Sequence, residues 1–195
     1  MAPTLETGRL VLRPWRDADL EPWAAMNADP RVMEFFPATL DRAESDAQVE
    51  RVRAKLEADG FGWWALEAKD GPSFAGVICL QRVPYDTPFG PAYEIGWRVA
   101  PACWGRGYAP EGARAAAAHA FGVLGLDEVV ALTARINVRS RRVMEKLGMT
   151  YDPADDFDHP RVAVGHPIRP HVLYRLRSAC AGERGRCSAV VGEGA

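Results

Sequence analysis

The sequence predicts an α+β protein built on one mixed, mostly antiparallel sheet that helices flank. Strand-like runs follow one another at 61–68, 73–83 and 92–99, and the short turns between them are typical of an antiparallel meander. The apolar residues then change from alternation to helical spacing, and an apolar run at 129–135 follows. Consecutive strands followed by alternating helices and strands indicate a single sheet covered by helices.

The first sixty residues contain one expected strand and two expected helices. The segment 7–15, TGRLVLRPW, places Leu10 and Leu12 in alternation and predicts a strand. A short helix is expected over 17–30, where an aspartate begins the pattern and an Asp-Pro pair ends it. A surface helix is expected over 40–60, with apolar residues roughly on one face and a glycine as its stop.

The part of the chain after the meander predicts two helices and two strands. Apolar residues recur at helical spacing from Ala113 to Leu124, and the run 129–135 is typical of a buried strand. A further helix is expected over 137–148, because its last residue is a glycine that can supply the stop. The alternating segment 171–177 is the expected last strand.

Length and composition indicate one globular domain. The chain has 195 residues, of which 48% are hydrophobic and 26% charged, which is enough to build a sizeable core. We expect a single domain over 1–177. A disordered tail is expected over 178–195, where small residues and glycine show no apolar period.

Charge and hydropathy exclude several partners. A net charge of −2 gives little bulk attraction to nucleic acid or to an anionic membrane, so neither is expected as a partner. No stretch of 18 apolar residues occurs, and the N-terminus lacks the layout of a signal peptide. A cytoplasmic location is therefore the default expectation. The four cysteines form no C-x-x-C pair, so we expect free thiols and no cysteine zinc site.

A glycine turn stands immediately before the alanine-rich helix. Residues 104–109 read WGRGYA, and glycine allows both unusual backbone conformations and close approach to a ligand. A helix start with such a turn is typical of an anion site, most often for phosphate. The dinucleotide fingerprint is not met, because its third glycine falls on Pro110. The ATP-type phosphate loop is not met either, because Ala113-Arg114 stands where Lys-Ser or Lys-Thr is needed.

Three motifs together resemble one enzyme family. The strand motif EIGW (94–97), the glycine turn and the segment NVRS…KLGM (137–149) are similar to those of the GNAT superfamily of acyl-coenzyme A N-acyltransferases. The pattern Trp-Gly-x-Gly-Tyr-Ala and the opening TGRLVLRPW resemble the branch typified by the RimJ and RimL ribosomal-protein acetyltransferases. The likeness covers roughly 5–177. It departs from the general signature at Trp104, where Gln or Arg is usual.

The resemblance implies a sheet of six to seven strands with about four helices, and acetyl-CoA as cosubstrate with no metal. Backbone N–H groups of the glycine turn are expected to hold the pyrophosphate. The end of the fourth long strand is expected to pair with the pantetheine arm, with a bulge at Gly96 or Trp97 opening the gap. The expected cofactor-binding residues are Trp97, Val99, Trp104, Gly105, Arg106, Gly107, Tyr108, Ala109 and Asn137. Of these, Arg106 either adds charge or points to solvent.

Two residues are the expected catalytic groups. An amine must lose a proton before it attacks, and family members often use an acidic residue in the strand that holds Glu94. The alternative is that Glu94 lies on a solvated strand face. Many relatives use a tyrosine as general acid, but that position is Met144 here, so the resemblance points to Ser140 as donor to the leaving sulfur. Asn137 is also the expected N-cap of its helix.

The long loop 151–170 is rich in proline, aspartate and histidine, and loops of this length tend to be functional or disordered. The spacing of its histidines matches no standard metal-ligand set, so a role for FDHP (157–160) in contacting the substrate is preferred. Trp63 and Trp64 must point to opposite faces of their strand, and one of them is expected to line the acceptor pocket.

The first hypothesis is therefore an acetyl-CoA-dependent N-acetyltransferase that acts on a primary amine, either a protein N-terminus or a small molecule. A second hypothesis keeps the fold but uses another acyl donor or an antibiotic acceptor. A third is a catalytically inactive coenzyme-A-binding regulator, which the absent tyrosine at Met144 favours. A homodimer is left open.

Overall fold

The computed structural model describes residues 2–179 of the 195-residue chain. Its strands are β1 (Leu5–Glu6), β2 (Leu10–Arg13), β3 (Trp63–Ala68), β4 (Gly76–Arg82), β5 (Tyr93–Val99), β6 (Glu128–Ala134), β7 (Thr150–Tyr151), β8 (Phe157–Asp158) and β9 (Pro170–Arg177). Its α-helices are α1 (Leu20–Ala28), α2 (Arg42–Asp59), α3 (Tyr108–Gly122) and α4 (Val138–Lys146). Three short 3₁₀ turns lie at Asp17–Asp19, Pro101–Cys103 and Pro153–Asp155.

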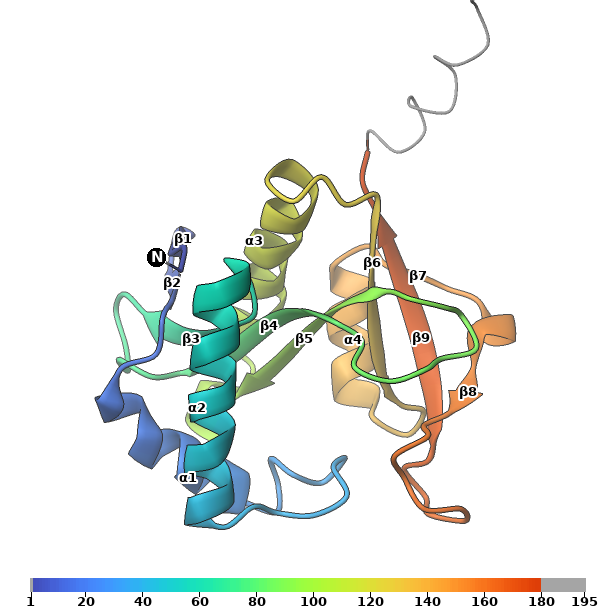
Figure 1. Ribbon diagram of the computed structural model, residues 1–195, viewed down its shortest axis with the longest axis horizontal. Coiled ribbons are helices and arrows are strands. Elements are labelled where there is room, and N and C mark those ends of the chain that lie inside the picture. The colour runs from blue at the N-terminus through green and yellow to red at the C-terminus, as the bar shows by residue number, and fades with distance from the viewer. Residues whose placement is uncertain (1, 180–195) are drawn as a thin grey trace, which may run out of the picture.

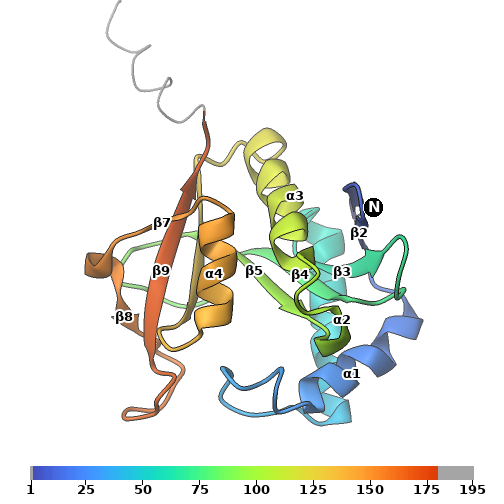
Figure 2. The same cartoon turned by 180° about the vertical axis from the view of Figure 1, so that it is seen from behind.

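The strands form one nine-stranded sheet in the order β1-β2-β3-β4-β5-β6-β9-β7, and β8 pairs with β9 off this path. All neighbours are antiparallel except β5 and β6, which run parallel. Helices α1 and α2 cover one face of the sheet, and α3 and α4 cover the other (Figures 1 and 2). The connection from β5 to β6 runs through α3, as a parallel pair requires a crossover.

The predicted α+β class is confirmed, and so is the number of α-helices over the described residues. The predicted strand count is too low, because β1, β7 and β8 are two-residue strands. A segment this short carries no alternation and forms only where a neighbouring strand offers hydrogen bonds, so its sequence predicts nothing. Of the expected tail 178–195, residues 180–195 lie outside the described part of the chain. No helix within residues 2–179 combines the length and apolar character that a membrane crossing demands.

Local signals explain the helix ends. The Asp41 side chain accepts a hydrogen bond from the Glu44 backbone N–H, and Glu44 bonds back, so a capping box begins α2. Gly60 ends α2 in the left-handed region with φ of 73°. Helix α3 lies very close to the sheet at Gly112, where an added Cβ atom would come within 2.8 Å of Ile78 Cγ1. This close packing fixes where the first turn of α3 lies relative to β4 and β5.

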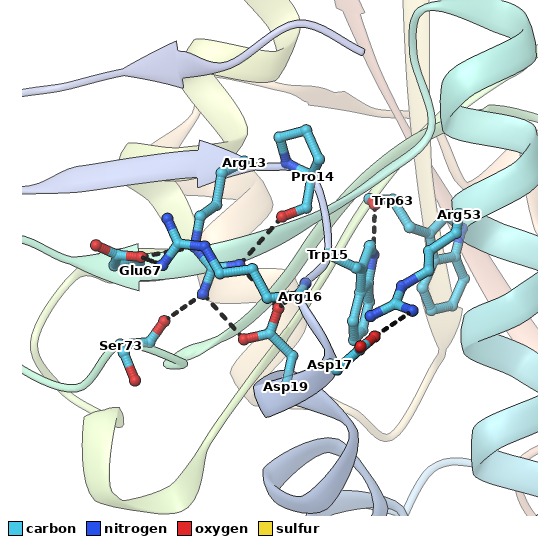
Figure 3. A network of polar contacts seen from close by, with 10 residues as sticks. All are labelled: Arg13, Pro14, Trp15, Arg16, Asp17, Asp19, Arg53, Trp63, Glu67 and Ser73. Carbon is cyan, nitrogen blue, oxygen red and sulfur yellow. Dashed lines mark hydrogen bonds and ion pairs between the residues drawn. The ribbon is translucent and has the colours of Figure 1, made fainter. Parts of the chain in front are cut away.

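A buried ion-pair network holds β2 to its neighbours (Figure 3). Arg13 forms a bidentate pair with Asp19, with Nη1–Oδ2 and Nη2–Oδ1 distances of 2.8 and 2.9 Å. Its Nε donates to Glu67 Oε2 at 2.6 Å and its Nη2 to the Ser73 carbonyl at 2.7 Å. The side chains of Arg13 and Asp19 are 4% and 2% exposed. The guanidinium therefore has two carboxylate partners in a site with almost no access to water.

Replacing Asp19 should therefore destabilise the fold strongly. Asp19→Ala leaves the buried Arg13 charge with only Glu67, and breaking such a pair costs about 3 kcal/mol or more. Chemical denaturation monitored by circular dichroism measures this loss. The control is Glu21→Ala, whose exposed carboxylate pairs with exposed Arg42 and whose loss should leave the unfolding midpoint essentially unchanged. Equal midpoints for the two variants would contradict the importance of the buried pair.

Candidate active site

The site begins where β5 separates from β6. Strand β5 pairs with β4 along its whole length, from Tyr93 opposite Arg82 to Val99 opposite Gly76. With β6 it shares a single register pair, Glu94 opposite Val130. Beyond this pair, the edge of β5 that faces β6 has no strand partner. The residues from Ile95 onward therefore offer backbone groups to an extended ligand.

The bulge expected at Gly96 or Trp97 is wrong. The β4–β5 register passes one-to-one through Cys79–Gly96 and Ile78–Trp97. The gap arises instead from the divergence of β5 and β6. Gly96 is needed for a packing reason, because a Cβ there would lie 2.9 Å from Cys79 Sγ.

The glycine turn has the conformation that its sequence predicts. Gly105 and Gly107 have φ of 76° and 79°, in the left-handed region that favours glycine. Gly107 is the N-cap of α3, and no side chain caps this helix start. The first helical hydrogen bond runs from the Glu111 N–H to the Gly107 carbonyl. The N–H groups of Tyr108 and Ala109 precede it and so lack helical partners, which makes this turn suited to an anion.

The N-terminal segment clamps this turn. Arg9 Nη1 donates to the Arg106 carbonyl at 2.9 Å, and Arg9 Nε donates to Glu111 Oε2 at 2.7 Å. The Thr7 hydroxyl donates to Glu111 Oε1 at 2.6 Å. Burial raises the pKa of Glu111, but these hydrogen bonds outweigh burial and hold it below the usual value. The motif TGR thus orients the start of α3, a role that the sequence did not reveal.

Helix α4 begins at the same opening. The Asn137 side chain accepts a hydrogen bond from the Ser140 backbone N–H at 3.2 Å, which confirms Asn137 as the N-cap. Its amide also donates to Thr133 Oγ1 at 2.9 Å. Ser140 uses its backbone N–H for the cap, so its hydroxyl is not required there. Met144, which stands at the usual tyrosine position, is 1% exposed and belongs to the core.

A cavity of about 680 Å³ joins these elements. Most of the predicted site residues line it, namely Glu94, Trp97, Val99, Trp104, Gly105, Gly107, Tyr108, Ala109, Asn137 and Ser140. Arg106 does not line the cavity, and its side chain is exposed. Trp104 donates from Nε1 to the Val99 carbonyl at 2.7 Å and so ties the turn to the end of β5. Trp63 lines the cavity, whereas Trp64 is buried and points to the opposite face.

Glu94 is the acidic side chain in the cavity lining. It accepts a hydrogen bond from Gln81 Nε2 at 3.3 Å, and Gln81 in turn accepts one from Trp63 Nε1 at 2.8 Å. Burial raises the pKa of Glu94 to about 7, although the bond from Gln81 opposes this shift. A carboxylate with this pKa can take up a proton near neutral pH.

Aromatic rings from two loops and from β9 also line the cavity. They include the rings of Tyr85 in the 83–92 loop and His159 in the loop before β9, whose centroids are 4.7 Å apart. His159 also lies 4.7 Å from His171. Burial, with the neighbouring cations, lowers the pKa of His159 to about 4, so this histidine is neutral at pH 7. His159 of the FDHP segment lines the cavity, and its contact with a substrate stays a prediction.

Several lining residues were not predicted from the sequence. They include Phe35, Phe36, Gln81, Tyr85 and Arg98. Gln81 could have been found from its expected position on the strand beside Glu94. The others come from loops or from a face of β5 whose covering only the tertiary structure defines. Within residues 2–179, no three His, Cys, Asp or Glu side chains are grouped so that they could hold a metal ion.

Comparison with known proteins gives a family. Residues 9–150 match the family model described as Acetyltransferase (GNAT) domain. The Aspergillus fumigatus protein named FsC-acetyl coenzyme A-N(2)-transacetylase is 37% identical over 158 residues, and the match covers 76% of this chain and 66% of that protein. The chain belongs to the GNAT superfamily and is an acyl-CoA-dependent N-acetyltransferase. The narrower likeness to RimJ and RimL stays a prediction.

Solved structures agree with this fold. The crystal structure of an acetyltransferase from Agrobacterium tumefaciens superposes with a TM-score of 0.71 at 28% identity, covering 91% of this chain and 96% of that one. A GNAT-family acetyltransferase from Bacillus anthracis has a TM-score of 0.74 at 23% identity, with 90% and 98% covered. The second likeness supports the fold alone.

The raised pKa of Glu94 should make stability depend on pH. The folded state binds this proton more tightly than the unfolded chain, whose glutamate titrates near 4.5. The free energy of unfolding should therefore fall as pH rises from about 4.5 to about 7, and this loss should vanish in Glu94→Gln. In calorimetric melting at pH 4.5, 6 and 8, the melting temperature of the variant should rise relative to that of the parent protein as pH rises. A constant difference would mean that Glu94 titrates normally.

Proposed function

We propose that this enzyme transfers the acetyl group of acetyl-CoA to a primary amine, of a protein N-terminus or a small molecule, by direct attack in a ternary complex. One observation supports this most strongly: a single cavity is lined by both the glycine turn and Glu94. The printed name of the fungal relative includes acetyl coenzyme A and an N(2) position, which agrees with a nitrogen acceptor.

The residues present fit acetyl-CoA. Backbone N–H groups of the turn 105–109 are suited to the pyrophosphate, because two positive-φ glycines and an uncapped helix start present donors there. The edge of β5 at Trp97–Val99 is suited to the amide arm. Asn137 and Trp104 flank this path in the cavity lining. When bound, acetyl-CoA supplies the thioester carbon that the amine attacks.

Glu94 acts as the general base in this proposal. Alkyl amines titrate between about 8 and 10.4, so most are protonated at pH 7 and must lose a proton. Glu94, with a pKa raised to about 7, accepts that proton directly or through a water molecule. As the C–N bond forms, backbone N–H groups near Trp97–Val99 stabilise the negative charge on the carbonyl oxygen.

Ser140 assists the leaving sulfur. The nitrogen of the tetrahedral intermediate gives up its second proton to solvent, the C–S bond breaks, and the departing thiolate takes a proton from solvent or from Glu94, so that an amide and free coenzyme A form with one proton released overall. Ser140 lies in the first turn of α4 and lines the cavity, so its hydroxyl can donate a hydrogen bond to that sulfur. Serine is a weak acid, so its contribution is polarisation rather than proton transfer. Met144 cannot serve as the acid, because a thioether has no proton to give.

Gly107→Val should abolish acetyl-CoA binding. Valine is strained at φ of 79° and should displace the helix start from its ligand position. Gly125→Val is the matched control, because Gly125 has a similar φ of 67° but does not line the cavity. Isothermal calorimetry should detect normal affinity in the control and none in Gly107→Val, with both folded by circular dichroism. Normal affinity in Gly107→Val would remove the turn from the donor site.

Glu94→Gln should lower turnover by about two to four orders of magnitude while acetyl-CoA affinity is kept. In the parent protein, kcat/KM should rise with pH through about 7, and this inflection should be absent from the variant. The deficit should shrink at high pH, where more of the amine is unprotonated. Ser140→Ala should lose less, because water and the helix N-terminus also stabilise the thiolate.

Thiol release with a panel of amines and N-terminal peptides measures these rates, and Glu57→Gln on the exposed surface of α2 is the conservative control. Full turnover by Glu94→Gln at pH 7 would place the base elsewhere. If no amine in the panel leads to thiol release while acetyl-CoA binding is intact, the inactive coenzyme-A-binding regulator would be favoured.

A further inference from the structure

Arg98 has an unusual place in the cavity. It lies on β5 on the same face as Glu94, the face that α1 covers. Its guanidinium carbon lies 4.8 Å from the ring centroid of Trp23 and 4.1 Å from that of Phe36, so the group contacts two aromatic rings. Its Nη1 donates to the side-chain oxygen of Asn27. The guanidinium is thus held in one orientation while it lines the cavity.

The charge of Arg98 is not neutralised. Within residues 2–179 it forms no ion pair with a carboxylate, and its buried Nε has no hydrogen-bond acceptor. Burial lowers its pKa to about 10, which leaves it charged at neutral pH. An unpaired charge with little access to water is unfavourable for a fold. Arg13 shows the contrast, because this other buried guanidinium has both Asp19 and Glu67 as partners.

The rest of the lining is also basic. The cationic residues that line the cavity are Arg31, Arg98, Arg139, Arg142, Lys146 and Arg161, whereas Glu94 is its only carboxylate within the described chain. All of these cations except Arg98 are exposed, so water screens them. Arg31 and Arg139 form ion pairs with Asp29 and Glu34, so the excess positive charge at the cavity comes mainly from Arg98, Arg142, Lys146 and Arg161. This excess disfavours a polycationic acceptor such as a polyamine or an aminoglycoside. An acceptor that carries a negative charge would supply the counter-ion that Arg98 lacks.

The remaining walls suit an apolar body. Phe35, Phe36, Trp63 and Tyr85 line the cavity. His159 adds a neutral ring to these walls. Hydrophobic and aromatic walls with a few placed polar groups are typical of small-molecule sites.

From these observations we infer that Arg98 binds a carboxylate of the acceptor, so that the enzyme's substrates are primary amines that combine an aromatic or apolar body with a carboxylate group. Glu94 and Arg98 then bind different ends of the acceptor: Glu94 receives the proton of the amine, and the Arg98 guanidinium pairs with the carboxylate. This inference rests on the proposed function, because it assigns the acceptor of the same reaction.

The test compares matched amines that differ in one carboxylate. The pairs are 4-(aminomethyl)benzoate with benzylamine, and a phenylalanyl dipeptide with its C-terminal amide. We expect kcat/KM to be at least about tenfold higher for each carboxylate-bearing member. In Arg98→Met the two members of each pair should differ in kcat/KM by no more than about twofold, because the cation that distinguishes them is absent. Arg98→Lys should retain part of the preference for the carboxylate, because lysine keeps the positive charge but lacks the planar guanidinium.

Arg42→Met is the control, because it removes the same charge at an exposed position outside the cavity and should retain the full preference. Melting curves and acetyl-CoA affinity verify that Arg98→Met is folded. Equal kcat/KM within both pairs for the parent protein would overturn the inference without any variant. A preference that survives in folded Arg98→Met would also overturn it.

A binding arm separates this inference from the proposed function. The carboxylate 4-methylbenzoate has no amine, so its binding does not depend on catalysis, and 4-methylbenzamide is its uncharged partner. Binding of the acid by the parent protein but not by Arg98→Met supports the inference even if no amine is acetylated, in which case only the proposed reaction fails. Acetylation of amines with no binding of the acid overturns the inference and leaves the proposed function standing.

Discussion

The site depends on one constraint, the single register pair between the parallel strands β5 and β6. Strand β5 is held by β4 along its length, so it cannot follow β6, and its far edge is left without a strand partner. The crossover between these strands is α3, whose start lies at the end of the same gap (Figure 2). A strand edge and an uncapped helix start therefore face one opening, and both offer backbone donors. The clamp of Thr7 and Arg9 on Glu111 keeps the helix start there.

Burial shifts the pKa values of the two charged residues of β5 that line the cavity in opposite directions. It raises the pKa of Glu94 to about 7 and lowers that of Arg98 to about 10, because each charged form is disfavoured away from water. The shift gives Glu94 a proton affinity suited to a base near neutral pH. In Arg98 the charge remains, and its unpaired buried Nε marks the place where the fold leaves a polar group unsatisfied. In contrast, the buried Arg13 is fully paired and serves the fold alone.

Much of the fold could be predicted because its elements carry regular patterns. Apolar and other residues alternate over the seven residues of β5, and apolar residues recur at helical spacing in α3. Such patterns arise where one face of an element is more apolar than the other, so the residue types alone indicate the element. The conformation of the glycine turn could also be predicted from the sequence, because only glycine adopts positive φ without strain. The two-residue strands were not, and the bulge expected at Gly96 was wrong, because pairing depends on which neighbour is present rather than on the strand's own residues.

The sequence by itself determined the family, the positive-φ glycine turn at 105–107, the N-cap at Asn137 and the position of Glu94 on its strand, because each is a local property of a few neighbouring residues. Only the tertiary structure decided what surrounds those residues. Arg98 contacts Trp23 and Asn27 on α1 and Phe36 in the following loop. All three residues lie more than sixty positions away from Arg98 in the chain. Burial, charge pairing and the shape of the acceptor pocket come from such distant contacts, and no local pattern encodes them.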